Sequence, residues 1–163
     1  MDTIFAPWRI AYIRAGKTAG CVLCRDSLRG NELVVCEGKS AFIMMNRYPY
    51  TGGHLMIVPH RHICRLEDLT TEERLELFAF QDLSLRVLKE AMKPEGFNIG
   101  MNLGKAAGAG IDDHLHIHVV PRWVGDTNFV SVIGELRVIP EDVIGTAGQL
   151  RPIFEKFQRE VGG

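Results

Sequence analysis

Residues 114–121 read His-Leu-His-Ile-His-Val-Val-Pro, an alternation of imidazole and aliphatic side chains that ends in a proline. In a β-strand, side chains two positions apart point to the same face. The segment is therefore predicted to be a strand with His114, His116 and His118 on one face and aliphatic residues in the core. The outer two imidazoles would stand about 13 Å apart, so one zinc ion, with Zn–N bonds of about 2.0–2.1 Å, cannot bind all three. We expect the three histidines to divide their functions.

A glycine-rich segment, GKAAGAG at 104–110, directly precedes the histidine strand. Glycine allows close approach of the backbone to a ligand, and successive N–H groups can bind an anion. The same composition is common in plain hairpin loops. Neutral imidazole is a good nucleophile that titrates near neutral pH. Together the loop and the histidines favour chemistry on a phosphate group.

The remaining segments predict an antiparallel α+β domain with a five-stranded sheet. The other expected strands are 32–38, 40–46, 54–60 and 96–102. Thr70 and Glu73 fit a capping box at the start of a long helix, 70–93, whose apolar residues recur every three or four positions. A second helix is expected around 141–160, interrupted near Pro152 because proline breaks the backbone hydrogen bonding.

The length and net charge of the chain favour a single globular domain that is not a general binder of nucleic acids or membrane surfaces. The chain has 163 residues and a net charge of −1, with 46% hydrophobic residues. We expect a single domain, 1–163, made of an N-terminal segment (1–31), a core (32–125) and a C-terminal extension (126–163). So balanced a charge argues against a nucleic-acid or membrane-surface partner. No apolar run approaches the ~18 residues of a membrane span, and the N-terminus does not resemble a signal peptide, so a cytoplasmic location is expected.

The four cysteines fall into two groups. Cys21 and Cys24 have C-x-x-C spacing, which in a reducing compartment indicates metal or redox chemistry. Cys36 and Cys64 are expected to be inert core thiols. A structural zinc ion needs four Cys or His ligands. The spacing alone leaves the other two open among the six histidines.

The histidine strand resembles a known signature. HLHIHVV (114–120) is similar to the His-φ-His-φ-His-φ-φ motif of the histidine triad (HIT) superfamily of nucleotide-binding proteins. AFIMMNRYPYTGGHLMIVPHRH (41–62) resembles the family's other signature, above all in its fragile-histidine-triad branch. GDTNF (125–129) is similar to diadenosine tetraphosphate phosphorylases and hydrolases. The resemblance covers roughly 33–130 and implies a single HIT-like domain.

The resemblance implies catalytic roles for two histidines. His116 would attack the α-phosphate of a nucleotide and form a covalent nucleotidyl-histidine, its ring held by a hydrogen bond from the other nitrogen to a backbone carbonyl. His118 would contact the α-phosphate oxygens and stabilise the developing charge. His54 would support the triad from behind. Past the strand, Arg122 would lie near the substrate entrance, where it could meet distal phosphates.

The resemblance also implies substrate contacts. Asn46 would bind ribose hydroxyls, although an Asn at a strand end is often only a turn former. Asn102 would bind phosphate, as would the backbone at Gly108, Ala109 and Gly110. Many family members have Gly-Gln-Ser/Thr there, and this chain has no such side chains. Backbone N–H groups alone would have to bind the phosphate, which leaves the preference for a leaving group open.

Metal, assembly and reaction follow from the same resemblance. His62 and His114 would join Cys21 and Cys24 around a structural zinc. Family members are commonly homodimers, here with 70–93 as the expected contact. The expected activity is cleavage of dinucleoside polyphosphates at an α-phosphate, with water (favoured by His118) or phosphate (favoured by GDTNF) as acceptor. Two alternatives remain, a nucleoside phosphoramidate hydrolase and a non-catalytic nucleotide-binding signalling module.

Overall fold

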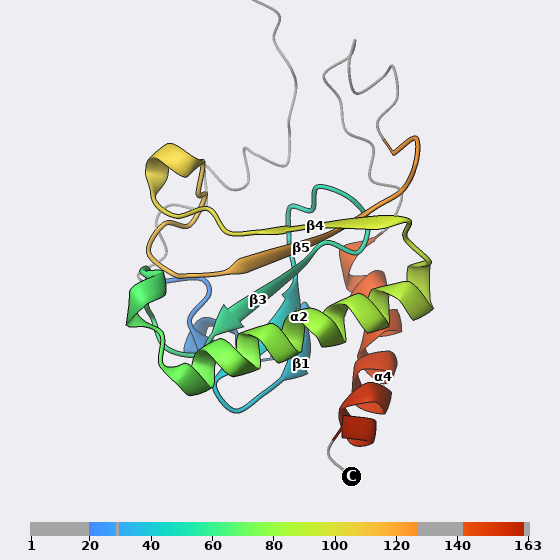
Figure 1. The fold of residues 1–163 in the computed structure, drawn as a ribbon, viewed down its shortest axis with the longest axis horizontal. Coiled ribbons are helices and arrows are strands. Elements are labelled where there is room, and N and C mark those ends of the chain that lie inside the picture. Colours follow the sequence, from blue (N-terminus) through green and yellow to red (C-terminus); the bar gives the residue numbers. More distant parts are fainter. Residues whose placement is uncertain (1–19, 29, 127–141, 162–163) are drawn as a thin grey trace, which may run out of the picture.

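Five antiparallel strands form one sheet in the computed structural model of the chain, which describes residues 20–28, 30–126 and 142–161. The order across the sheet is β1-β2-β3-β5-β4 (Figure 1). The strands are β1 Val34–Glu37, β2 Ala41–Met45, β3 Leu55–Pro59, β4 Gly96–Gly100 and β5 Ile117–Arg122. This confirms the expected α+β class. Most of the expected N-terminal segment and residues 127–141, with the last three letters of GDTNF, lie outside the described residues.

The centre of the sheet is apolar on both faces. Every residue of β2 (AFIMM) and β3 (LMIVP) is buried, and the two strands pair in register from Ala41↔Pro59 to Met45↔Leu55. Strands buried on both faces read as continuous apolar runs rather than alternating ones. At the edge, β4 is half-buried or exposed throughout. The core therefore lies around β2 and β3, and β5 carries its histidine beside that core.

The long helix α2, Thr71–Met92, begins with the predicted capping box. The Thr70 hydroxyl accepts the N–H of Glu73 at 3.2 Å, and the Glu73 carboxylate accepts the N–H of Thr70 at 2.8 Å. The expected face, which includes Leu77, Phe80 and Val87, is buried. The helix crosses one face of the sheet (Figure 1) and contacts β3 and β2.

The C-terminal helix α4 corrects one prediction. It runs without interruption from Val143 to Val161 with Pro152 inside it. Proline removes one helical hydrogen bond and costs about 3 kcal/mol in a helix interior. Leu150 and Phe154, on either side of the exposed Pro152, are almost completely buried, and α4 contacts both α2 and β1. Burial of these side chains offsets the cost of the proline.

The histidine strand starts later than predicted. β5 begins at Ile117, so that His114 and His116 lie in the segment that leads into it. Other bonds hold this segment: Leu115 donates its N–H to the Ile63 carbonyl at 2.6 Å. The ladder with β3 covers only three pairs, from Ile57↔Ile117 to Leu55↔Val119. Irregular backbone thus carries two of the three histidines that strict alternation places in the strand.

Two smaller features complete the fold. Cys36 is buried as expected, whereas Cys64 is exposed and is not a core thiol. Within the described parts of the chain, no helix is both long and apolar enough to cross a bilayer.

Candidate active site and metal centre

Three histidine rings from two neighbouring strands meet at one place. The ring centroids of His116 and His118 are 4.8 Å apart in an edge-on arrangement. His54, immediately before β3, is fully buried, and its Nε2 lies 3.0 Å from Nδ1 of His118. Antiparallel pairing of β3 with β5 places these residues together although 64 positions separate them.

Hydrogen bonding fixes the tautomer of His116. Its Nδ1 lies 2.8 Å from the backbone carbonyl oxygen of His114, which can only accept, so Nδ1 carries the proton. Nε2 then holds an unprotonated lone pair, and no described residue hydrogen-bonds to it. The residue is 6% exposed. This confirms the predicted bond to a backbone carbonyl and leaves Nε2 able to act as a nucleophile.

A second chain of bonds fixes His118. The N–H of Tyr50 donates to Nδ1 of His54 at 3.0 Å, so this nitrogen is an acceptor and the proton of neutral His54 lies on Nε2. That proton points at Nδ1 of His118, which leaves the His118 proton on its own Nε2. Burial, with the neighbouring His116 charge, lowers the pKa of His118 to about 4. His118 is therefore a neutral hydrogen-bond donor at pH 7.

Asn46 and Asn102 differ in the hydrogen bonds that their side chains make within the protein. The Oδ1 of Asn46 accepts the N–H of Tyr48 at 2.9 Å, which is the turn-forming role of an Asn side chain. Its Nδ2 lies 3.5 Å from each ring nitrogen of His54, too far for a strong bond. Asn102 is half-buried and makes no side-chain hydrogen bond to the described residues. Its amide is thus open to a ligand, whereas that of Asn46 is partly engaged.

The glycine-rich loop is exposed and contains one turn of 3-10 helix, η3, Lys105–Ala107. Gly108 adopts φ +79°, which a side chain would disfavour, and its N–H donates to the Lys105 carbonyl at 3.0 Å. The N–H groups of Ala109 and Gly110 make no hydrogen bond within the described residues. Of the three loop residues expected to bind phosphate, the last two have N–H groups available.

Arg122 is tied to the protein surface. Its guanidinium bonds both carboxylate oxygens of Asp126 at 2.6 and 2.8 Å and the Asn98 side chain at 2.8 Å. The bond to Asp126 raises the pKa of Arg122 further. Most of its donors are therefore occupied, which weakens the expectation of a contact to distal phosphates.

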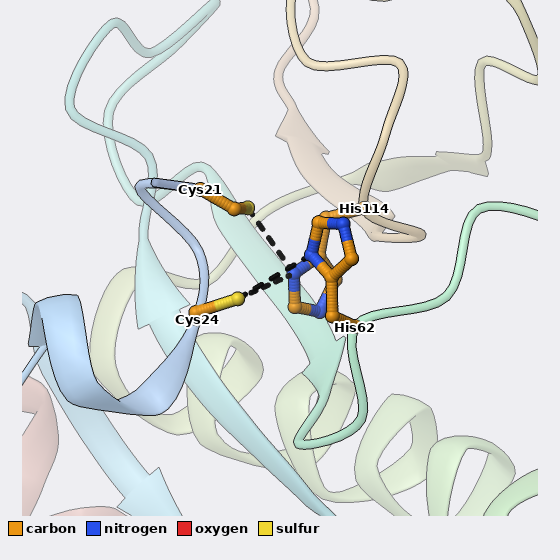
Figure 2. A group of neighbouring side chains, drawn as sticks. All are labelled: Cys21, Cys24, His62 and His114. Carbon is orange, nitrogen blue, oxygen red and sulfur yellow. Dashed lines mark hydrogen bonds between the residues drawn. The ribbon is translucent and has the colours of Figure 1, made fainter. Parts of the chain in front are cut away.

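The second cluster joins four side chains from three parts of the chain. The ligand atoms of Cys21, Cys24, His62 and His114 all lie within 4.8 Å of one another, with both sulfurs facing the imidazoles (Figure 2). Nδ1 of His114 is 3.3 Å from Sγ of Cys21, and Nδ1 of His62 is 3.3 Å from Sγ of Cys24. This confirms that the four expected ligands come together.

The donor set fits a tetrahedral metal. Zn–S and Zn–N bonds of about 2.3 and 2.0–2.1 Å place the ligand atoms of a tetrahedral site about 3.3–3.8 Å apart. Nε2 of His114 donates to the Pro59 carbonyl at 2.9 Å, which turns the unprotonated Nδ1 towards the thiols. Burial lowers the pKa of His114, so it stays neutral as a ligand must. Burial raises the pKa of the Cys21 thiol to about 11, and a metal would displace its proton.

Two surface clefts lie elsewhere. One, of about 430 Å³, is lined by residues that include His60, Arg61 and Glu76, and the other, of about 470 Å³, by residues that include Arg25 and Phe42. Neither is lined by the histidines of the two clusters. Tyr50 is a further residue of the histidine cluster that the sequence pattern does not single out, and its ring lies against His54 and His118. Its only sequence signal was an aromatic residue four positions before His54.

Comparison with known proteins gives a consistent picture. The family model described as "HIT domain" matches residues 29–124. "AP-4-A phosphorylase" of Mycobacterium tuberculosis is 52% identical over 109 residues, which are 67% of this chain and 56% of the relative. "Bis(5'-adenosyl)-triphosphatase" of Dictyostelium discoideum is 30% identical over 122 residues, 71% of this chain and 81% of the relative. The chain thus spans about half the length of the M. tuberculosis relative.

Solved structures agree on the fold. A zinc-bound histidine triad family protein from Mycobacterium smegmatis superposes with a TM-score of 0.69 at 28% identity, covering 86% of this chain and 97% of that one. A uridylyltransferase gives a TM-score of 0.67 at 20% identity, covering 92% of this chain and 50% of the other. The second likeness concerns the fold alone.

Proposed function

The chain belongs to the HIT domain family, and from this we propose that it cleaves dinucleoside polyphosphates of the diadenosine tetraphosphate type at an α-phosphate. One observation carries the proposal. The unprotonated Nε2 of His116 is next to a second imidazole, His118, whose Nε2 is protonated. A nucleophile beside a neutral hydrogen-bond donor suits attack on a phosphate, where negative charge develops on the oxygens.

In the first step, the Nε2 lone pair of His116 attacks the α-phosphorus. The bond from this phosphorus to the bridging oxygen breaks, and ATP leaves with the electron pair when the substrate is diadenosine tetraphosphate. The His116 ring now carries a positive charge, and the His114 carbonyl, which accepts its Nδ1–H, stabilises that charge. The result is an adenylyl group on Nε2 of His116.

In the second step an acceptor displaces His116 from the phosphorus. Water as acceptor yields AMP and a proton, and inorganic phosphate yields ADP. We propose phosphate, supported by the 52% identity to a protein named as a phosphorylase and by the GDTNF stretch. Many family members have Gly-Gln-Ser/Thr where this chain has Gly108-Ala109-Gly110. Because the loop lacks those side chains, contacts to the acceptor come from its backbone N–H groups.

The surrounding residues bind the substrate. His118 donates its Nε2–H to an α-phosphate oxygen, and His54 holds His118 in that orientation. The free amide of Asn102 and the N–H groups of Ala109 and Gly110 bind phosphate oxygens, with Gly108 shaping the loop. Asn46 contacts the ribose hydroxyls through the donors of its amide. These assignments follow the family's motif, except at the loop 108–110, where the chain lacks the Gln and Ser/Thr of many members.

We further propose a structural zinc held by Cys21, Cys24, His62 and His114. The convergence of the four side chains and a zinc-bound relative support it. A bound zinc ion would cross-link the N-terminal segment to the loops before β5. It would also hold His114, whose carbonyl orients the nucleophile. Such a site keeps its thiols in a reducing compartment such as the cytoplasm.

We propose a homodimer as the working assembly. Leu75 and Phe78 on the outer face of α2 are 67% and 69% exposed, and exposed apolar side chains are typical of a protein contact. Light scattering coupled to size-exclusion chromatography tests this, since a monomer mass at micromolar concentration contradicts it. Double substitution of Leu75 and Phe78 by Ser should give the monomer.

Phosphorus NMR tests the reaction. The protein is incubated with diadenosine tetraphosphate, with and without inorganic phosphate. ADP with ATP, formed only when phosphate is present, is the expected result. Formation of AMP and ATP regardless of phosphate would support cleavage at the α-phosphate and show that the acceptor is water instead of phosphate. Binding without any product, or cleavage of a nucleoside phosphoramidate alone, contradicts the proposal and supports a binding module or a phosphoramidate hydrolase.

A further inference from the structure

Tyr50 lies against both histidines that stand behind the nucleophile. Its ring centroid is 4.7 Å from that of His54 and 5.9 Å from that of His118, and the two imidazoles are 5.1 Å apart. The three rings therefore contact one another as a triangle. Aromatic rings at such distances stabilise one another beyond the area that they bury. The orientation of His118 thus depends on Tyr50 and His54 as well as on the neighbouring ring of His116.

The main chain of Tyr50 acts on the same pair. Its N–H donates to Nδ1 of His54, and this bond determines which nitrogen of His54 carries the proton. The loop around it is anchored at the next residue, where the Thr51 hydroxyl donates to the Pro121 carbonyl at 2.9 Å. One residue thus supplies both the bond that sets the tautomer of His54 and the ring that packs on it.

Exposure separates Tyr50 from the rings beneath it. His54 is 0% exposed, whereas Tyr50 is 44% exposed. The tyrosine ring is therefore the most exposed member of the triangle, since His118 is half-buried. Without it, water would reach the His54–His118 pair and compete for the hydrogen bond between them.

We propose that Tyr50 is a positioning residue for His118. Through His54 it keeps the His118 proton on Nε2, where it can be donated to a ligand. The tautomer follows from the geometry alone, and only its effect on turnover rests on the proposed function. If the proton moved to Nδ1, the lone pair of Nε2 would face the phosphate oxygens and repel them.

Histidine NMR tests the tautomer directly. In protein labelled with nitrogen-15 histidine, long-range proton–nitrogen spectra distinguish protonated from unprotonated ring nitrogens. The wild type and Tyr50→Phe, which retains the ring, should show His118 with its proton on Nε2 only. Tyr50→Ala retains the backbone N–H bond to His54 and removes only the ring, so water that reaches the His54–His118 pair should produce a mixture of both tautomers. An unchanged, single Nε2–H tautomer in Tyr50→Ala overturns the proposal.

Tyr48 provides the matched control. It is a tyrosine in the same loop with the same exposed fraction, 44%, and its N–H bonds to Oδ1 of Asn46 rather than to His54. Tyr48→Ala should leave the His118 spectrum unchanged, and a mixture of tautomers there would show a general effect of the loop and contradict the proposal. If Tyr50→Ala does not fold, Tyr50→Val, whose short side chain leaves most of the space of the ring open to water, is expected to give the same mixture.

Turnover of diadenosine tetraphosphate gives a second readout. Tyr50→Ala should lower kcat in proportion to the fraction of His118 that loses its Nε2 proton in the spectra, about twofold for an equal mixture, because only that fraction lacks the donor to the transition state. KM should stay unchanged, as should both constants of Tyr50→Phe and Tyr48→Ala. A wild type without turnover would refute the proposed function and leave the NMR result to decide on Tyr50. Wild-type kcat in Tyr50→Ala overturns the catalytic part.

Discussion

At the scale of single residues, the partner of one ring nitrogen determines what the other can do. His114 donates from Nε2 to Pro59 and turns Nδ1 to the thiols. His116 donates from Nδ1 to the His114 carbonyl and keeps a lone pair on Nε2. His118 accepts at Nδ1 from His54 and keeps a proton on Nε2. Three identical side chains in one short segment are thus suited to the three roles that we propose, a metal ligand, a nucleophile and a hydrogen-bond donor.

The low pKa of His118 predicts a pH-dependent stability. The folded protein takes up this proton near pH 4, whereas the ordinary value is 6.5. Between these values the unfolded chain binds more protons, so the free energy of unfolding falls as the pH drops from 6.5 towards 4 and levels off below. After allowance for partial exposure, the loss is about 1–2 kcal/mol.

Urea unfolding from pH 4 to 8 measures this effect. The difference between the wild type and His118→Gln isolates the contribution of His118, because both proteins share the other acid-sensitive groups. The wild type should lose its advantage over the variant, or fall below it, as the pH decreases. A difference that is constant over this range would contradict the assignment.

Several of these residues were predictable and several were not. Alternation predicted a shared face for the three triad histidines, and the family's motif supplied the expected roles of His116, His118 and His54. The tautomers could not be read from the sequence, because they depend on carbonyls at Pro59 and His114 that the fold brings close. Tyr50 lies in a segment with the composition of a loop, and its role depends on where that loop packs against His54 and His118.

At the scale of elements, the start of α2 concentrates several bonds on one carboxylate. Glu73 is 4% exposed, accepts the Thr70 N–H and also bonds Arg61 through both oxygens at 2.6 and 2.7 Å. The side-chain bond to Arg61 is the main cause that lowers the pKa of Glu73. The carboxylate therefore ties the helix to the segment that follows β3.

Replacing this carboxylate should destabilise the protein. Glu73→Ala removes half of the capping box and leaves Arg61 without its partner, at a cost of about 1–3 kcal/mol. Urea denaturation measures it. Glu72→Ala, an exposed carboxylate one position earlier, is the control and should stay within about 0.5 kcal/mol of the wild type. Equal stabilities of the two variants would contradict the role of Glu73.

Replacing Pro152 should stabilise the protein, in contrast to the replacement of Glu73. Because α4 continues through it and the side chain is exposed, Pro152→Ala should restore a backbone hydrogen bond without loss of packing. We expect a gain of about 1–2 kcal/mol in the free energy of unfolding, after subtraction of the entropy that proline removes from the unfolded chain. The same urea titration applies, and a destabilised variant would show that the helix needs its proline.

Element types followed from the sequence better than element ends. The apolar period predicted α2 and its cap, and the apolar runs predicted β2 and β3. Local rules failed at Pro152 and at the start of β5. At Pro152 the burial of Leu150 and Phe154 overrides a local preference. At β5, the Leu115–Ile63 bond replaces the regular ladder.

At the scale of the whole molecule, the sheet order links the two clusters. β3 lies beside β5, so the segments that carry His54 and His62 flank the segment that carries all three triad histidines. His114 belongs to both clusters, since its ring faces the thiols and its carbonyl holds His116. A disturbance at the metal site should therefore reach the nucleophile.

Metal analysis tests the proposed metal site and its contribution to the stability of the fold. The wild type should contain about one equivalent of zinc, and Cys21→Ser should lose it and melt at a lower temperature. Cys64→Ser, an exposed thiol outside the cluster, should retain the metal and the melting temperature. Unchanged zinc content in Cys21→Ser would contradict the ligand set.

The central claim is that His116 becomes covalently nucleotidylated, and rapid-quench mass spectrometry tests it most directly. The protein is mixed with diadenosine tetraphosphate without inorganic phosphate and quenched in denaturant at alkaline pH, where a phosphorus–nitrogen bond persists. We predict one adenylyl group, mapped to the peptide that contains His116, which disappears when phosphate is added and never forms in His116→Ala. An adduct on another residue, or full turnover by His116→Ala, would contradict the account.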